Sequence, residues 1–244
     1  MLQPYEDDPN NNGLLLMDAE ELFEYGQLAV KNGISMAVHA IGDRANHEVL
    51  KAYAQLRELE GSLQLHSKAQ LRHRIEHVQI LHPDDVRHLS VLNIIASMQP
   101  IHATSDMLMA DQFWGKRSVL AYAWREQISN GAKLIFGSDA PVESPNPFWG
   151  IHAAVTRHRV DGFPSALGWY PEQRLSITEA VRAYTTGPAF AAGTENKAGR
   201  LAPGYLADLI ILNDDPYSCS PDVLLNIHPL ATMVGGEWVF FEME

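Results

Sequence analysis

Ser35-Met-Ala-Val-His39 is an apolar, strand-like run that ends on a metal-binding residue type. Two later runs, His73-Arg-Ile-Glu-His77 and Lys133-Leu-Ile-Phe-Gly-Ser-Asp139, end in the same way. Helical patterns separate the three runs, so the chain is built of strand–helix units. In a parallel barrel the carboxyl ends of the strands converge on one rim, where catalytic groups gather. The sequence therefore predicts that two histidines and an aspartate, distant in the chain, meet around one cation.

Strand-like and helical patterns alternate four times along the chain. Capping pairs mark two of the helix starts, at Asp18 with Glu21 and at Ser176 with Glu179. Repeated units of this kind predict a parallel sheet with right-handed crossovers, and four strands are half of an eight-stranded barrel. A small open, doubly wound sheet and a barrel completed by another chain are the alternatives. The predicted strands span residues 34–39, 73–77, 94–98 and 134–137, and the predicted helices span residues 18–33, 43–60, 83 onward, 117–128 and 176–184.

The pattern changes at about Gly199. Residues 207–212 form a predicted strand, and residues 233–240 are typical of a hairpin that turns on Gly235-Gly236. We therefore predict a main α/β domain over residues 1–198 and a small β appendage over residues 199–244.

The charge and cysteine content exclude several function classes. The chain has 18 Lys and Arg against 30 Asp and Glu, a net charge of -12, whereas a nucleic-acid surface needs a positive footprint. The same charge disfavours anionic membranes, and no stretch approaches the roughly 20 apolar residues of a membrane helix. Cys219 is the single cysteine, so no internal disulfide forms and a reducing, cytoplasmic location is expected.

Strand alternation supports the metal prediction. It places Ala37 and His39 on one face of their strand, and Gly137 and Asp139 on one face of theirs. Small residues below a polar terminal residue suit a barrel interior with its site at the top. Imidazole and carboxylate ligands suit zinc and similar divalent ions. Taken singly, each histidine is better explained as a hydrogen-bonded structural group, and Asp139 could be a helix cap or turn residue before Pro141. The corresponding positions of the three residues are what favour a metal site.

Other polar residues near the predicted rim have two interpretations. His102 follows the third strand and either polarises a substrate carbonyl or is a partly exposed loop histidine, and Asp106 carries the same ambiguity. His152 comes after the fourth strand and is interpreted as a packing residue rather than a pocket residue. His158 is expected on the surface or in a helix.

A zinc protease is the minor enzymatic alternative. His73-Arg-Ile-Glu-His77 matches H-x-x-E-H, which requires a helix that presents both histidines on one face. No cap precedes the run, and Pro83 follows a few residues later. A strand is therefore the preferred interpretation.

Several motifs together resemble the amidohydrolase superfamily, and most closely its amidohydrolase-3 branch, which includes N-substituted formamide deformylases. The resemblance covers essentially the whole chain in the right order. The motifs are Val38-His-Ala-Ile-Gly-Asp-Arg-Ala45, Arg74-Ile-Glu-His-Val-Gln79, Ala96-Ser-Met-Gln-Pro100, Gly137-Ser-Asp-Ala-Pro-Val142 and Gly199-Arg-Leu-Ala-Pro-Gly-Tyr-Leu-Ala-Asp-Leu-Ile-Ile-Leu212.

The resemblance implies the C-terminal half, strands five to eight, of a metal-dependent hydrolase TIM (β/α)8 barrel, followed by a small C-terminal β-sandwich segment. It implies His39 and His77 as metal ligands, Asp139 as a ligand and proton shuttle, and His102 as a substrate contact. The implied cofactor is a divalent metal, with zinc as the expected ion, and the implied substrate is a small molecule with a non-peptide, amide-like carbon–nitrogen bond.

The chain departs from the family in lacking the first four barrel strands and the N-terminal strands of the β-sandwich. The family's first-strand His-x-His pair does not occur in it, and residues 4–13 are turn chemistry with which a domain seldom begins. We therefore expect a fragment of a longer enzyme. The alternative is a catalytically silent half-barrel that needs a missing half or forms a homo-oligomer through its exposed edges.

Overall fold

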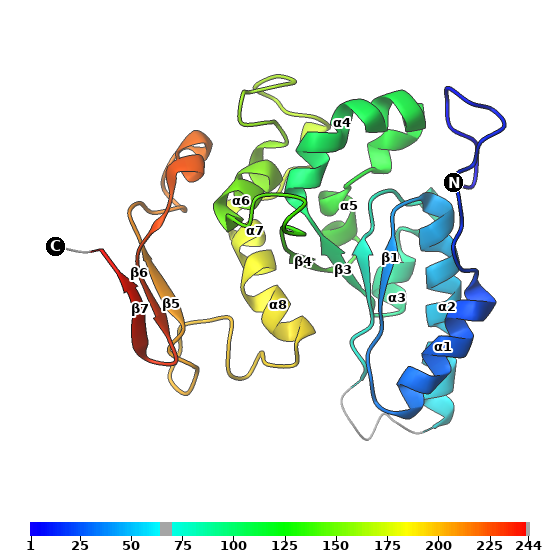
Figure 1. Cartoon of the computed structure of the whole chain (residues 1–244), viewed down its shortest axis with the longest axis horizontal. Coiled ribbons are helices and arrows are strands. Elements are labelled where there is room, and N and C mark those ends of the chain that lie inside the picture. The colour runs from blue at the N-terminus through cyan, green and yellow to red at the C-terminus, as the bar shows by residue number, and fades with distance from the viewer. Residues whose placement is uncertain (64–69, 243–244) are drawn as a thin grey trace. The chain divides into compact units, whose positions relative to one another are not determined.

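The structure of the chain is a computed structural model that describes residues 1–63 and 70–242. In these residues the named strands form two sheets. The first sheet has the order β1-β2-β3-β4, and its β1–β2 and β2–β3 pairs are parallel (Figure 1). The second has the order β5-β6-β7 and is antiparallel. The mixed α/β class and the parallel sheet predicted from the sequence are confirmed.

The elements lie close to their predicted positions, with three α-helices, α4, α6 and α8, that were not predicted. The strands are β1 Ala37–Ala40, β2 Arg74–His77, β3 Ile95–Met98, β4 Lys133–Phe136, β5 Leu209–Leu212, β6 Pro229–Val234 and β7 Glu237–Phe241. The α-helices are α1 Ala19–Lys31, α2 Asp43–Ser62, α3 His88–Val91, α4 Pro100–Trp114, α5 Trp124–Ser129, α6 Pro147–Thr156, α7 Ile177–Tyr184 and α8 Thr186–Ala191. The 3-10 helices are η2 Pro83–Asp85, η3 Gly115–Leu120, η4 Pro171–Gln173 and η5 Pro221–Asn226.

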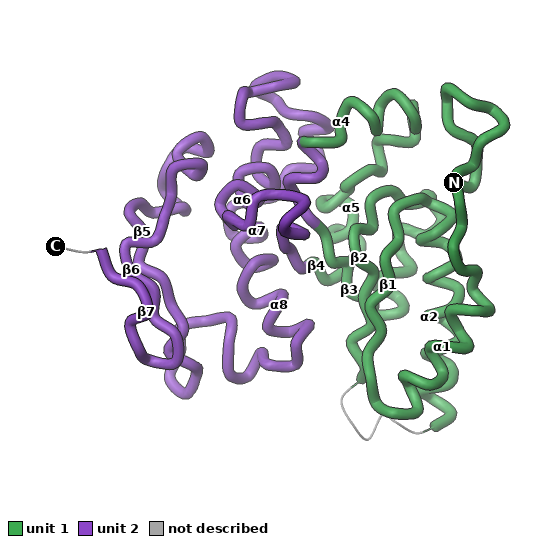
Figure 2. Tube along the Cα trace, viewed as in Figure 1, with its two compact units in different colours: residues 1–98, 105–134 green, residues 99–104, 135–244 purple. Residues whose placement is uncertain are grey.

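The chain divides into two compact units (Figure 2), and each is described by itself. Unit 1 holds residues 1–98 and 105–134, and unit 2 holds residues 99–104 and 135–244. The boundaries of these compact units do not coincide with residue 199, where the sequence pattern changes from α/β to β. The domains predicted over residues 1–198 and 199–244 stay a prediction.

Unit 1 is built on the packing of two helices beside β1. The Asp18 side chain accepts hydrogen bonds from the backbone N–H groups of Glu20 and Glu21, which satisfies free donors at the start of α1. The helix ends before Gly33, whose φ of 70° suits a residue without Cβ. α1 packs against α2, and α2 against β1 (Figure 1). The predicted helix starts at residues 18 and 43 are therefore confirmed.

Asn46 of α2 fixes the carboxyl ends of β1 and β2. Its side chain is fully buried, and its Nδ2 lies 3.0 to 3.3 Å from four backbone carbonyl oxygens. Three belong to the segment that follows His39, and the fourth belongs to Ile80 after β2. Ile80 N also donates to the Ile41 oxygen at 3.1 Å. One amide group thus holds together the two segments that follow the strand-end histidines.

His73 is a structural residue. It is buried, its Nδ1 accepts the backbone N–H of Met36 at 2.9 Å, and its Nε2 lies 2.9 Å from Glu60 Oε1. Arg57 donates to both carboxylate oxygens of Glu60. The residues from Arg74 to His77 form a strand. The zinc-protease alternative is therefore wrong, because its helix is absent and both nitrogens of its first histidine are already bonded.

Replacing Glu60 by Gln is expected to lower the free energy of unfolding by about 3 kcal/mol at pH 7, because it removes the charge of a buried pair. Burial by itself raises the pKa of the Glu60 carboxyl, but the hydrogen bond from His73 and the charge of Arg57 outweigh burial and hold the pKa below its usual value. A lowered pKa stabilises the folded state at pH values above the usual pKa of glutamate. This contribution to the free energy of unfolding disappears as the pH falls through the folded-state pKa.

Urea unfolding of both proteins at pH 7 and in acid tests this prediction. The difference between parent and variant should shrink in acid. Glu58→Gln, an exposed change on the same helix, is the matched control and should stay within about 0.5 kcal/mol of the parent. Equal losses for the two variants, or a difference that does not change with pH, would contradict the assignment.

Unit 2 confirms two local predictions. Ser176 and Glu179 form a reciprocal capping box at the start of α7. β6 and β7 form a hairpin whose turn residues, Gly235 and Gly236, have φ values of 59° and 87°, the backbone that two-residue hairpin turns require. Among the described residues, no helix has both the length and the apolar composition needed to cross a bilayer.

Candidate metal centre and adjoining cavity

The first pair of predicted ligands meets in unit 1. His39 lies on β1 and His77 ends the adjacent parallel strand β2, which pairs in register through His39 and Glu76. Their imidazole rings are edge to face, with centroids 4.5 Å apart and planes at 72°. His39 is exposed and His77 is half-buried. Two imidazoles from neighbouring strand ends therefore lie side by side at this edge of the sheet.

The second pair meets in unit 2. His102 Nε2 lies 3.5 Å from Asp139 Oδ2, and His102 Nδ1 lies 3.4 Å from Glu143 Oε1. His102 is 8% exposed and lies in the first turn of α4, so the loop assignment for it was wrong. A proline at the first helical position, as Pro100 is here, is compatible with a helix start. The helical patterning expected only from residue 117 begins at residue 100.

The backbone is unusual at two of the predicted ligands. His77, the last residue of β2, has a φ of 75°, and Asp139, three residues after the end of β4, has a φ of 56°, so both lie in the left-handed region. Residues other than glycine rarely adopt this conformation, and such positions concentrate at functional sites. Ile135 and Gly137 are half-buried and Asp139 is exposed, while Leu134 and Phe136 on the opposite face are buried. The predicted alternation of β4 is thus present.

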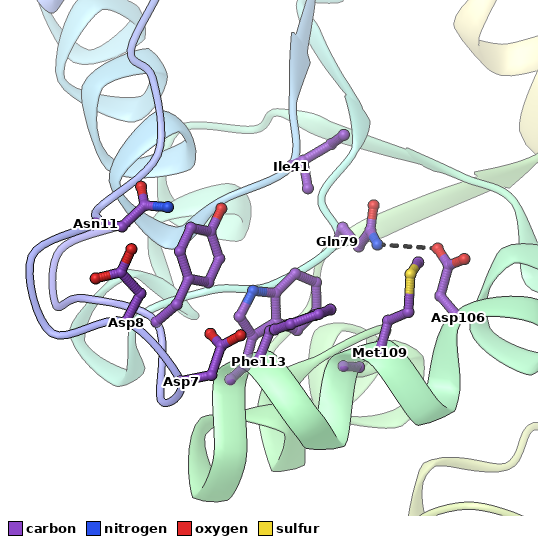
Figure 3. A pocket seen from close by; sticks show the side chains of 11 residues that line it. Asp7, Asp8, Asn11, Ile41, Gln79, Asp106, Met109 and Phe113 are labelled. Atoms are coloured by element: carbon purple, nitrogen blue, oxygen red, sulfur yellow. Dashed lines mark hydrogen bonds between the residues drawn. The ribbon is translucent and has the colours of Figure 1, made fainter.

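A cavity of about 540 Å³ in unit 1 adjoins the strand ends (Figure 3). Ile41 and Gln79, each two residues after a strand-end histidine, form part of its wall. Asp106 forms another part and accepts hydrogen bonds from Gln79 Nε2 at 3.1 Å and from the Tyr122 hydroxyl at 2.6 Å. Asp106 lies on α4 and faces this cavity. The sequence leaves open whether Asp106 lines a site or is a loop residue.

The N-terminal loop supplies the opposite wall. Asp7, Asp8 and Asn11 lie across the cavity from Gln79 and Asp106 (Figure 3). Tyr5 of the same loop also lines the cavity. A second cavity of about 660 Å³ shares Tyr5 with the first and is also lined by His39. The sequence indicated only turns for residues 4–13, so these wall residues were missed. Glu143 was missed as well, although its place four residues after Asp139 could have indicated it.

A family model described as the amidohydrolase family matches residues 1–240. The chain is 36% identical over 243 residues to Protein LONG AFTER FAR-RED 3 of Arabidopsis thaliana, covering 98% of this chain and 40% of that protein. It is 27% identical to the N-substituted formamide deformylase of Arthrobacter pascens, covering 88% of this chain and 38% of that enzyme. The chain therefore spans about two fifths of the length of these curated relatives.

A solved structure of a metal-dependent hydrolase has a fold similar to that of this chain. A metal-dependent hydrolase from Pyrococcus furiosus superposes on the chain with a TM-score of 0.74 at 31% identity. The match covers 88% of this chain and 41% of that structure.

Proposed function

The chain belongs to the amidohydrolase family, and from this premise we propose that it serves metal-dependent hydrolysis of a non-peptide, amide-like carbon–nitrogen bond. The observation that carries the proposal is the pair of strand-end imidazoles, His39 and His77, with ring centroids 4.5 Å apart beside a cavity. The left-handed backbone at His77 and Asp139 supports it.

Membership of the amidohydrolase family also leads to a proposal about the fold. We propose that β1 to β4 correspond to strands five to eight of a (β/α)8 barrel and that β5 to β7 belong to a small β-sandwich. The parallel pairing and register of the first sheet agree with a barrel wall. The antiparallel hairpin of the second sheet agrees with a sandwich.

His39, His77 and Asp139 would hold the divalent cation, with zinc as the expected ion. Their donor set, two imidazole nitrogens and a carboxylate oxygen, is one that zinc accepts in catalytic sites. When bound, such an ion supplies Lewis acidity that lowers the pKa of a coordinated water to about 7.

The protein's own groups would move the protons and stabilise charge. Asp139, whose side chain is 43% exposed, would take the proton of the attacking water and deliver it to the departing nitrogen. His102, held at 3.5 Å from Asp139, would donate a hydrogen bond to the oxygen that gains charge on the reacting carbonyl. Glu143, at the other ring nitrogen of His102, would orient that ring.

The cavities suit a small organic substrate. A volume of about 540 Å³ is within the usual range for small-molecule sites, which combine apolar walls with a few polar groups. Met109 and Phe113 supply apolar surface, and Asp106 and Gln79 supply a fixed acceptor and donor (Figure 3). Because a relative is named for N-substituted formamides, we propose amides of that class as the first substrates to test.

The experiment combines metal content with a substrate panel. The protein, stripped with chelator and reloaded with Zn²⁺, is incubated with N-substituted formamides and other non-peptide amides, and released amine is measured. His39→Asn with His77→Asn is expected to lower bound zinc by about one equivalent and to abolish amine release, because both imidazole ligands are lost.

Two outcomes would contradict parts of the proposal. Unchanged zinc content in the double variant would remove His39 and His77 from the metal site. Stoichiometric zinc without release of any amine would favour a catalytically silent chain that binds metal, the alternative to an enzyme.

A further inference from the structure

Two histidines at the C-terminal end of α6 take no part in the proposed hydrolysis. His152 lies on α6, and His158 lies two residues beyond its end. Their rings are edge to face, with centroids 5.0 Å apart and planes at 76°. Asp222 of η5 has its Oδ1 4.0 Å from His152 Nε2. One potential ligand atom of each residue lies within 4.8 Å of the other two, and all three residues belong to unit 2.

His152 brings a buried ring nitrogen without a partner to this cluster. The residue is 1% exposed, and its Nε2 is shielded from solvent and forms no hydrogen bond. Buried polar atoms are nearly always satisfied, so such an atom points to a missing ligand.

The second histidine is oriented by its surroundings. His158 Nδ1 lies 2.8 Å from the Arg159 carbonyl oxygen, which can only accept, so Nδ1 carries the proton and the neutral ring keeps a lone pair on Nε2. The Thr156 hydroxyl donates to the His152 carbonyl oxygen at 2.7 Å and accepts the backbone N–H of His158 at 3.3 Å. Arg157, with a φ of 59°, turns the chain between them. Together these contacts keep the two rings adjacent.

The aspartate is held near the histidines by the packing of η5 on α6. The Trp149 indole donates to the Leu225 carbonyl oxygen at 3.3 Å, and Leu224 is buried. The Asp222 side chain itself is 85% exposed. It can therefore rotate toward the rings without disturbing the packing beneath it.

We propose that His152, His158 and Asp222 bind a divalent transition-metal ion such as Zn²⁺, at a site separate from that of hydrolysis. Two imidazoles, one carboxylate and a water complete a four-coordinate zinc shell. Ligand atoms around tetrahedral zinc are about 3.4 Å apart, given metal–ligand distances of about 2.1 Å. The 4.0 Å between Nε2 of His152 and Oδ1 of Asp222 closes to that separation through a small rotation of the exposed carboxylate.

The consequence is a cross-link between α6 and η5. An ion bound by both elements stabilises their contact by its binding free energy, as structural zinc sites do. This inference does not depend on the proposed hydrolysis, because the two sites share no residue.

Co²⁺ titration of a variant that lacks the hydrolytic ligands tests the proposal. In His39→Asn, His77→Asn, Asp139→Asn protein, stripped with chelator, one equivalent of Co²⁺ is expected to bind. The visible spectrum should be that of a four-coordinate ion, and added Zn²⁺ should displace it. His158→Gln or Asp222→Asn in that background should raise the Kd for Co²⁺ at least about 100-fold, since the loss of groups that only support a ligand already costs 10- to 100-fold.

The matched control is His228→Gln. His228 is exposed, and its Nδ1 lies 2.9 Å from the Asn226 carbonyl oxygen, the same local bond that His158 makes. This variant should bind Co²⁺ like its background. No binding by the triple variant, or equal binding after His158→Gln, would overturn the proposal. Circular dichroism distinguishes either result from unfolding, and neither bears on His39 and His77.

Discussion

Replacing Asp139 by Asn is expected to lower kcat/KM for amide hydrolysis about 1,000-fold at saturating Zn²⁺. Asp139 has a left-handed backbone after β4, an exposed carboxylate and a histidine 3.5 Å away. An amide in its place keeps the shape and one oxygen but cannot accept and return a proton. General acid–base groups contribute about 10²- to 10⁴-fold to rates, and the expected loss is within this range.

The assay needs saturating zinc, because Asp139 is also a proposed ligand and its loss weakens metal binding. Steady-state rates at several zinc concentrations separate the two effects, since a rate lost through metal affinity alone returns when zinc is added. Asp84→Asn is the matched control. Its Oδ2 lies 3.5 Å from His82 Nδ1, the same separation as at Asp139, but its side chain is 87% exposed and lies outside the proposed site. A loss below about tenfold for Asp139→Asn, or an equal loss for Asp84→Asn, would remove the proton-transfer role.

The strands and the first helices could be predicted because their patterns are local. Asp18, Gly33 and Ser176 fix helix ends through side chains and backbone angles that depend on a few neighbouring residues. The two helices that follow β3 and β4 could not be found in this way. α4 begins at a proline that also suits a strand end, and α6 is buried on most of its surface, so it lacks a polar face to mark the helical period.

For the candidate site, the sequence suggested ligands, which stay a prediction, and did not indicate the residues around them. Strand-end positions suggested His39, His77 and Asp139, since strand ends of a parallel sheet converge by geometry alone. The partner of His102 at Glu143 and the cavity wall at Tyr5 depend on loop conformations. Loops follow tertiary contacts rather than a hydrophobic period, which is why the sequence did not indicate them.

Replacing Asn46 by Asp is expected to lower the free energy of unfolding by at least about 4 kcal/mol, the largest stability effect of any change considered. The side chain is 0% exposed, and its Nδ2 faces four backbone carbonyl oxygens. A carboxylate of the same shape has no hydrogen to donate there, so both N–H donors of the amide are lost. The substitution would also bury a negative charge beside four carbonyl oxygens that carry partial negative charge. The combined loss of stability is in the range that is exceptional for single substitutions.

Urea unfolding at pH 7 measures the loss, and Asn32→Asp provides the comparison. Asn32 also donates through Nδ2 to a helix carbonyl, that of Leu28 at 2.8 Å, but its side chain is exposed. Losing a solvated bond of this kind costs under about 1 kcal/mol, including the unfavourable charge at a helix C-terminus. A small loss for Asn46→Asp would mean that the segments after β1 and β2 hold their positions without this amide.

The effect of Asn46→Asp should also reach the proposed metal centre. The bonded carbonyls of Ala40, Ile41 and Gly42 follow His39 directly, and the bonded oxygen of Ile80 lies three residues after His77. In protein that remains folded, for example at 10 °C, zinc affinity is therefore expected to fall by about 10- to 100-fold, as it does when groups that orient ligands are lost. Asn32→Asp should leave zinc affinity unchanged. If Asn46→Asp destabilises the chain and zinc binding stays intact, Asn46 supports the core and does not position the two histidines.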